Sequence, residues 1–259
     1  MLPVIHIGPL VLQTPGLVLI LGVWSGISAI ERFAKKHGQN ADRLSTLVLI
    51  GLAAGVLGAR LAYAGANWHA FTGNWQSLFS LTPTMLDPFG GFAAAVIAAL
   101  IYGQRVRLSF WPTLDALTPG AAIFVIFIHL ASLLSGDGFG TATSLPWGIW
   151  LWGELRHPTQ LYAAAAAALI AFILYRGQRQ FLQTPGVLAL TWLACTAFVS
   201  ILLEPLRGDS TVIAAGLRME QLVAWFVLAG AMILIGRRLN VRGKSPAVSR
   251  IEDTARGSE

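Results

Sequence analysis

Five side chains that could do chemistry stand in or beside strongly apolar stretches of the sequence: Arg60, His129, Arg156, Arg207 and Arg218. A charged group in such a stretch is energetically costly unless it has a partner or faces a polar cavity. The planar guanidinium of arginine binds phosphate oxygens through two parallel hydrogen bonds. A neutral imidazole can accept a proton near neutral pH. These residue types therefore predict a site that binds a phosphate group and moves a proton.

The arginines also have a structural interpretation, which the sequence leaves open. Arg156 and Arg218 lie near the ends of apolar segments, from which a long side chain can extend to the lipid headgroups. Arg60 lies inside such a segment, where it could form a structural ion pair. Arg207 could pair with Glu204, three residues earlier, or with Asp209, two residues later, without contacting any substrate.

His129 likewise has two interpretations. A lone histidine among apolar residues is more often a hydrogen-bonded packing residue than a catalytic one. The polar residues that follow it, Ser132, Ser135 and Asp137, offer partners for the imidazole. In that setting a neutral imidazole could serve as a proton acceptor.

The segments that carry these residues have the length and composition of membrane spans. Of the 259 residues, 55% are hydrophobic and only 12% are charged. Soluble domains carry roughly twice that charged fraction, and disordered chains are poor in apolar residues, so both classes are excluded. A helix needs about 20 apolar residues to cross a bilayer. We expect seven such segments, with six or eight as alternatives: 15–34, 44–65, 88–104 (the shortest), 114–135, 158–176, 185–204 and 216–236.

The distribution of Lys and Arg predicts the orientation of this bundle. The first 31 residues contain neither type, which argues against a cleaved signal peptide. Fourteen of the 18 basic residues follow the first, third, fifth and seventh segments. The positive-inside rule places those ends in the cytoplasm, so the N-terminus is expected outside and the C-terminus inside. The net charge of +6 is then a topology signal, and nucleic acid is not expected as a partner.

The expected organisation is an all-α, polytopic transmembrane bundle over residues 1–239, followed by a poorly ordered cytoplasmic tail over 240–259. The single cysteine, Cys195, excludes an intramolecular disulfide. The sequence contains no metal-ligand spacing, phosphate-binding loop or GxSxG elbow. We therefore expect neither a metal nor a cofactor. An internal repeat, which marks many transporters, is also not apparent.

Three motifs point to a known family. The most specific is Arg156-His157-Pro158-Thr159-Gln160-Leu161-Tyr162. The others are Gly58-Ala59-Arg60-Leu61 and the pair formed by Glu204 and Arg207. These motifs resemble those of the bacterial phosphatidylglycerol–prolipoprotein diacylglyceryl transferases, and the likeness extends over most of the chain.

The resemblance implies transfer of a diacylglyceryl group from phosphatidylglycerol to the lipobox cysteine of a prolipoprotein. The implied partners are phosphatidylglycerol or another anionic phospholipid and the prolipoprotein signal peptide, in the bacterial cytoplasmic (inner) membrane. His129, as base or substitute cation, and Asp137, which would orient it, are the implied catalytic residues. The implied substrate-binding residues are Arg60, Arg156, His157, Gln160, Tyr162, Glu204 and Arg207, with Arg60 and Arg207 on the phosphate.

The chain departs from the family pattern in its most characteristic segment, at residues 128–137. His129 stands where the family has its central Arg, Ser132 replaces the first Asn, and Asp137 replaces Glu. Ser200 stands where the family has a further Arg. Because an imidazole lacks the five-donor fork of a guanidinium, altered or reduced activity is expected. The main alternative is a catalytically inactive relative that binds phospholipid or a lipidated partner; a transporter or channel is less favoured.

Overall fold

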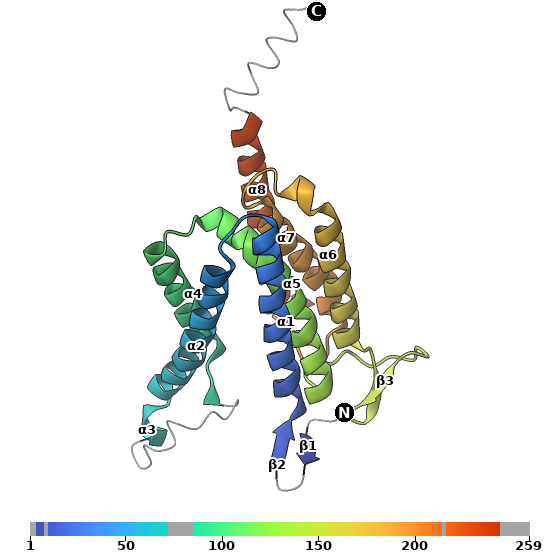
Figure 1. Cartoon of the computed structure of the whole chain (residues 1–259). Coiled ribbons are helices and arrows are strands. Elements are labelled where there is room, and N and C mark those ends of the chain that lie inside the picture. The colour runs from blue at the N-terminus through green and yellow to red at the C-terminus, as the bar shows by residue number, and fades with distance from the viewer. Residues whose placement is uncertain (1–3, 8–9, 72–84, 214–215, 244–259) are drawn as a thin grey trace, which may run out of the picture. The chain divides into compact units, whose positions relative to one another are not determined.

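The computed structural model describes residues 4–7, 10–71, 85–213 and 216–243 (Figure 1). The chain divides into two compact units. Unit 1 comprises residues 1–29 and 114–259, and unit 2 comprises residues 30–113. Residues 244–259, most of the predicted tail, lie outside the described residues.

Seven long helices are present in the described part of the chain: α1 (Thr14–Lys36), α2 (Ala41–Ala66), α4 (Pro88–Arg105), α5 (Phe110–Ser135), α6 (Thr159–Phe181), α7 (Val187–Leu203) and α8 (Met219–Gly243). Each overlaps most of one of the seven predicted segments, and the helix ends differ from the predicted ends by one to seven residues where they do not coincide. Six of them are long and apolar enough to cross a membrane. The remaining helix, α4, has 18 residues and corresponds to the short third segment. The prediction of an all-α, multi-pass membrane bundle is confirmed.

Short elements connect the long helices. Strands β1 (Val4–Ile7) and β2 (Leu10–Gln13) form an antiparallel hairpin before α1. Strands β3 (Ile149–Leu151) and β4 (Glu154–Arg156) form a second hairpin between α5 and α6. Its two-residue turn, at Trp152 and Gly153, has positive φ at both positions, as the tight turns that join twisted strands require. The short helices are α3 (Trp68–Phe71) and η3 (Glu204–Leu206).

In unit 2, helices α2 and α4 pack against each other through small residues. A Cβ atom added at Gly58 would overlap the side chain of Ala94. One added at Gly91 would lie 2.9 Å from the carbonyl oxygen of Gly55. Lipid supplies no hydrophobic driving force between helices, so bundles in membranes depend on such close backbone approach. The glycines of α2 and α4 therefore define this helix pair.

In unit 1, α7 packs against both α6 and α8, with Ile201 of α7 against Ala224 of α8. Asp115 of α5 is 2% exposed. Its carboxylate accepts hydrogen bonds from the backbone N–H groups of Gly186, at 2.6 Å, and Ala189, at 3.0 Å. These N–H groups lie at the start of α7, where a helix has no backbone acceptors of its own. Asp115 thus fixes α5 to α7.

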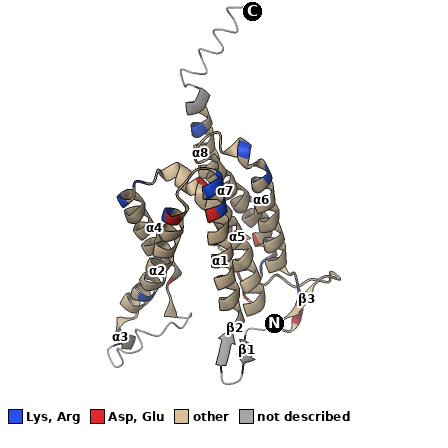
Figure 2. Cartoon of the chain, viewed as in Figure 1, with Lys and Arg blue, Asp and Glu red and all other residues tan. Residues whose placement is uncertain are grey.

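Basic side chains in unit 1 gather near helix ends. Arg176 and Arg179 lie near the end of α6, and Arg237 and Arg238 near the end of α8 (Figure 2). The long middle parts of these helices are apolar, so the positive charges lie at the ends of candidate membrane spans. The predicted orientation rests on this pattern and stays a prediction.

Candidate functional site

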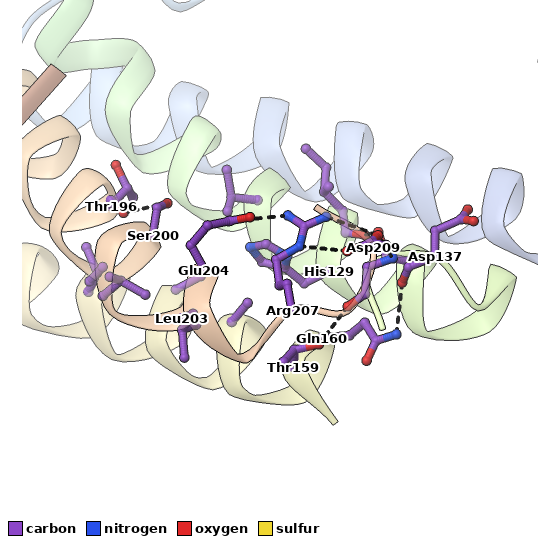
Figure 3. A pocket seen from close by; sticks show the side chains of 18 of the residues that line it. His129, Asp137, Thr159, Gln160, Thr196, Ser200, Leu203, Glu204, Arg207 and Asp209 are labelled. Carbon is purple, nitrogen blue, oxygen red and sulfur yellow. Dashed lines mark hydrogen bonds and ion pairs between the residues drawn. The ribbon is translucent and has the colours of Figure 1, made fainter. Parts of the chain in front are cut away.

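A cavity of about 410 Å³ lies in unit 1, lined by α5, α6, α7 and the segments that follow α5 and α7 (Figure 3). Its wall combines apolar residues with a set of polar ones: His129, Ser132, Asp137, Thr159, Gln160, Thr196, Ser200, Glu204, Arg207 and Asp209. Polar groups that converge in a pocket between apolar helices are typical of a functional site within a membrane.

Arg207 brings a guanidinium to this cavity from the segment after η3. Its Nε and Nη2 donate hydrogen bonds to the two carboxylate oxygens of Asp209, at 3.0 and 3.2 Å. Its Nη1 lies 3.8 Å from Oε2 of Glu204. Burial by itself would lower the pKa of Arg207, but the hydrogen bond to Asp209 and the charges of Asp209, Glu204 and Glu220 raise it above the ordinary value. Arg207 is therefore a permanent cation held between carboxylates.

Two acceptor oxygens in the wall of the cavity are buried and have no hydrogen-bond partner among the described residues. One is Oε1 of Glu204, a residue that is 3% exposed at the end of α7. The other is Oε1 of Gln160, also 3% exposed, whose Nε2 donates to the carbonyl oxygen of Asp137 at 2.8 Å. A buried, unsatisfied acceptor costs about 1–3 kcal/mol. The wall of the cavity therefore contains two buried acceptors to which no described residue donates a hydrogen bond.

His129 reaches the same cavity from α5, and Figure 3 draws its ring beside Arg207. The two are close enough for the charge of Arg207 to act on the imidazole. Asp137 also lines the cavity, but its carboxylate accepts a hydrogen bond from the hydroxyl of Ser135 at 2.7 Å. The described residues show no hydrogen bond between His129 and Asp137, so the orienting role of Asp137 stays a prediction.

The backbone beside Arg207 is fixed by the glycine-rich segment after α5, which comprises residues 136–140. Gly138 donates its N–H to Asp209 at 2.8 Å, and Gly208 donates to the carbonyl oxygen of Phe139 at 2.7 Å. A Cβ atom at Gly208 would lie 2.9 Å from the carbonyl oxygen of Gly140. The glycines thus allow the two segments to meet, and this pairing positions Arg207.

Three residues of the predicted site lie beside the cavity and are not among the described residues that line it: Arg156, His157 and Tyr162. Arg156 pairs with Glu154 at 2.8 Å, and its guanidinium lies 4.9 Å from the ring centre of Phe139. His157 Nδ1 is 3.5 Å from the hydroxyl of Tyr162. The contact of Arg156 with Phe139 joins the β3–β4 hairpin to the glycine-rich segment. The contact of His157 with Tyr162 joins the residue after the hairpin to α6. From the same motif, Gln160 does line the cavity.

Arg60 belongs to unit 2, whereas every residue that lines the cavity belongs to unit 1. Arg60 is 6% exposed. Its Nη1 donates to the carbonyl oxygen of Met85 at 2.9 Å, and its guanidinium lies 5.5 Å from the ring centre of Phe71. The structure therefore gives Arg60 structural partners within its own unit, and its role in phosphate binding stays a prediction.

Arg218 also has structural contacts. It donates hydrogen bonds to the carbonyl oxygen of Arg207, at 2.6 Å, and to the hydroxyl of Ser210. The first of these bonds holds the backbone of Arg207. Arg218 therefore helps to position Arg207 at the cavity.

Among the hydroxyl residues of the wall, the sequence analysis named Ser132 only as a possible partner of His129 and Ser200 only as a departure from the family pattern. It missed Thr196, although a signal for Thr196 and Ser200 exists. Thr196, Ser200 and Glu204 follow one another at intervals of four in a mainly apolar segment. That spacing places them on one face of the helix. Asp209 was noted only as a possible ion-pair partner of Arg207 and has no comparable periodicity, because it lies in irregular structure.

Apolar helices around a cavity with a cation and several acceptors define a polytopic membrane protein with a polar cavity between its helices. The comparisons with known proteins give the family. The sequence matches the family model described as "Prolipoprotein diacylglyceryl transferase" over residues 3–236, and the chain belongs to that family. The resemblance found in the sequence motifs is thereby confirmed, and with it the class of transferase.

Curated relatives align with most of the chain and carry the name phosphatidylglycerol–prolipoprotein diacylglyceryl transferase. The relative from Clostridioides difficile is 26% identical, with 84% of this chain and 87% of the relative covered. The relative from Finegoldia magna is 27% identical, with 85% and 88% covered. That from Prochlorococcus marinus is 26% identical, with 90% and 88% covered. The similarity therefore extends over nearly the full length of both partners.

Proposed function

We propose that this protein transfers the diacylglyceryl group of phosphatidylglycerol to the cysteine thiol of a prolipoprotein. It does so in the bacterial cytoplasmic membrane, with the N-terminus outside. The observation that carries the proposal is Arg207, a permanent cation in a polar cavity between apolar helices of a family member. Such a cavity can hold a phosphate while the acyl chains stay in lipid.

The reaction combines a substitution at carbon with a proton transfer. The sulfur of the cysteine attacks the phosphate-bearing carbon of the acylated glycerol, so a C–S bond forms while the C–O bond from that carbon to the phosphate breaks. Glycerol phosphate leaves with the electron pair, and the thiol gives up its proton. Catalysis thus requires a cation where negative charge develops on the phosphate, and a base for a thiol of ordinary pKa about 8.5.

The residues of this chain fit those two requirements. Arg207 binds the phosphate, with Glu204 and Asp209 holding the guanidinium in place. His129, adjacent to Arg207, accepts the thiol proton, and Asp137, which lines the same cavity, orients the imidazole. A phosphate-binding role of Arg60 is also proposed, and it rests on the sequence resemblance alone.

The test is transfer in reconstituted vesicles. Purified protein in phosphatidylglycerol vesicles should add the mass of a diacylglyceryl group to a lipobox peptide, and Arg207→Ala or His129→Ala should abolish the product. Arg179→Ala is the matched control, because Arg179 is an exposed arginine near the end of α6, away from the cavity. It should transfer at the wild-type rate.

A different result would support the alternative of an inactive, lipid-binding relative. In that case the folded wild-type protein leaves the peptide unmodified while an active family enzyme modifies it under the same conditions. Substitution of the family arginine by His129 is the feature of the sequence that favours this alternative.

A further inference from the structure

Three exposed tryptophans lie on the segment between α5 and α6, in and beside the β3–β4 hairpin. Trp147, Trp150 and Trp152, which together we call the tryptophan surface, are each more than half exposed, and Trp150 is 75% exposed. Residues 138–153, which contain all three, include no Asp, Glu, Lys, Arg or His. A contiguous exposed apolar surface of this kind marks a site of contact with a membrane or with another protein.

One of the three tryptophans stands where the backbone disfavours it. Trp152 has a φ of 54° at the first turn position of the hairpin. A bulky residue rarely adopts this left-handed conformation, and Asn, Asp or Gly is usual at this position of a two-residue turn. Backbone strain of this kind gathers at functional sites. The position of Trp152 therefore indicates a use for its ring that the turn itself does not explain.

Hydrogen bonds hold two of the rings at the ends of two membrane helices. Trp152 Nε1 donates to the carbonyl oxygen of Gly136 at 3.3 Å, and Gly136 directly follows α5. Trp147 Nε1 donates to the hydroxyl of Tyr162 at 2.8 Å, in the first turn of α6. Both helices are long and apolar enough to cross a membrane. The tryptophan surface therefore lies where these two spans end, and Figure 1 shows the segment with β3 extending to the side there.

We propose that the tryptophan surface binds the interfacial region of the lipid bilayer, between the hydrocarbon and the water. An indole suits this region because its apolar body and its polar N–H prefer different surroundings. The surface carries no charge that would complement a peptide, since Glu154 and Arg156 of β4 pair with each other at 2.8 Å. This inference does not depend on the proposed transfer activity.

The experiment places a fluorescent label at position 150 of the full chain in a bilayer. Trp150→Cys is made in a Cys195→Ala background, because Cys195 is the single cysteine. The protein is labelled with nitrobenzoxadiazole and reconstituted in vesicles of phosphatidylcholine and phosphatidylglycerol. Three quenchers are compared: a nitroxide on the lipid headgroup, a nitroxide near the end of the acyl chain, and aqueous iodide. Trp24→Cys in the same background is the matched control, because Trp24 is a similarly exposed tryptophan in the middle of α1.

We expect the headgroup nitroxide to quench the label at position 150 at least about twofold more strongly than the chain-end nitroxide does, with little quenching by iodide. The label at position 24 should show the reverse order of the two nitroxides. Trp152→Asn, added to the variant labelled at position 150, suits the turn but removes a ring. It should lower the headgroup quenching by at least about a third.

Quenching of position 150 mainly by iodide would overturn the inference, because the surface would then face water. Stronger quenching by the chain-end nitroxide would overturn it in favour of burial in the hydrocarbon. Protection from iodide that appears only with an added lipobox peptide would overturn it in favour of a protein partner. Unchanged quenching with Trp152→Asn would remove Trp152 from the surface.

A second measurement covers a folding defect of the labelled protein. The same nitroxides are applied to the intrinsic fluorescence of the wild type and of Trp150→Phe. The difference between the two proteins gives the quenching of the Trp150 indole, and the same order of quenchers is expected. A difference that only iodide quenches would overturn the inference without any label.

Discussion

Arg60 in unit 2 and Arg207 in unit 1 are both arginines in mainly apolar surroundings, yet their partners differ in kind. Arg60 is 6% exposed, donates to the carbonyl oxygen of Met85 and lies over the ring of Phe71. The Arg207 side chain is 36% exposed and lies between two carboxylates at a cavity. The type of partner and the access to a cavity thus distinguish two arginines that look alike in sequence.

The helix packing around the two arginines also differs. Helices α2 and α4 of unit 2 meet through glycines, which bring the two backbones together. In unit 1, α5, α6 and α7 leave a cavity of about 410 Å³ with hydroxyls and carboxylates in its wall. A guanidinium that joins backbone segments stabilises its unit, whereas one that borders a cavity can also bind a ligand.

The largest expected effect is that of Arg207→Ala on transfer. The variant removes the phosphate cation and leaves the carboxylates of Asp209 and Glu204 without it, so the rate should fall at least about 100-fold. Arg207→Lys keeps the charge but loses the bidentate geometry, and should recover part of the rate. Initial rates in phosphatidylglycerol vesicles measure both variants. An Ala variant with more than a third of the wild-type rate would refute the assignment.

The complementary change in unit 2, Arg60→Ala, should act mainly on stability. It removes a buried donor from the carbonyl oxygen of Met85 and the cation from the ring of Phe71. The free energy of unfolding should therefore fall by about 2–3 kcal/mol. Denaturant titration in detergent measures this change. Unchanged stability with a raised KM for phosphatidylglycerol would show instead that Arg60 contacts the lipid, as the sequence predicted.

The close contact between α2 and α4 is tested by Gly58→Ala. The new methyl group would overlap Ala94, and overpacking of this kind costs about 1–3 kcal/mol. Gly65→Ala, in the same helix, is the matched control, because no atom lies within 4 Å of its added Cβ. A lower melting temperature for Gly58→Ala alone is the expected result. Equal melting temperatures would mean that the glycine contact does not hold the pair together.

The smallest expected effect is that of alkaline pH on Arg207. Its folded-state pKa is raised, so the stability that its charge contributes is present below the ordinary arginine value and is lost only as the pH rises through the higher folded value. Affinity for short-chain phosphatidylglycerol should therefore stay constant from about pH 7 to 9.5. Measurement in a His129→Gln background removes the imidazole from the comparison. A decline over this range would show that another group controls binding.

Sequence reasoning succeeded where one residue and its near neighbours decide the outcome. The membrane spans follow from hydropathy, because only a helix satisfies its own backbone hydrogen bonds in lipid. The pairing of Arg207 with Glu204 follows from a three-residue spacing on the chain. The motif that begins at Arg156 is the most specific of the motifs that indicate the family. None of these conclusions depends on which helix packs against which.

The location of each side chain relative to the cavity depended on tertiary structure. Gln160 and Tyr162 are two residues apart in one motif, yet only Gln160 lines the cavity, since helix rotation against α5 and α7 decides which face points inward. Asp209 holds Arg207 because a loop places it there, and the backbone of Gly138 completes the contact. The sequence alone determined the membrane bundle and its family, because both depend on local composition and motifs. Which polar groups share one cavity was decided by packing between distant segments, because spacing along the chain does not fix it.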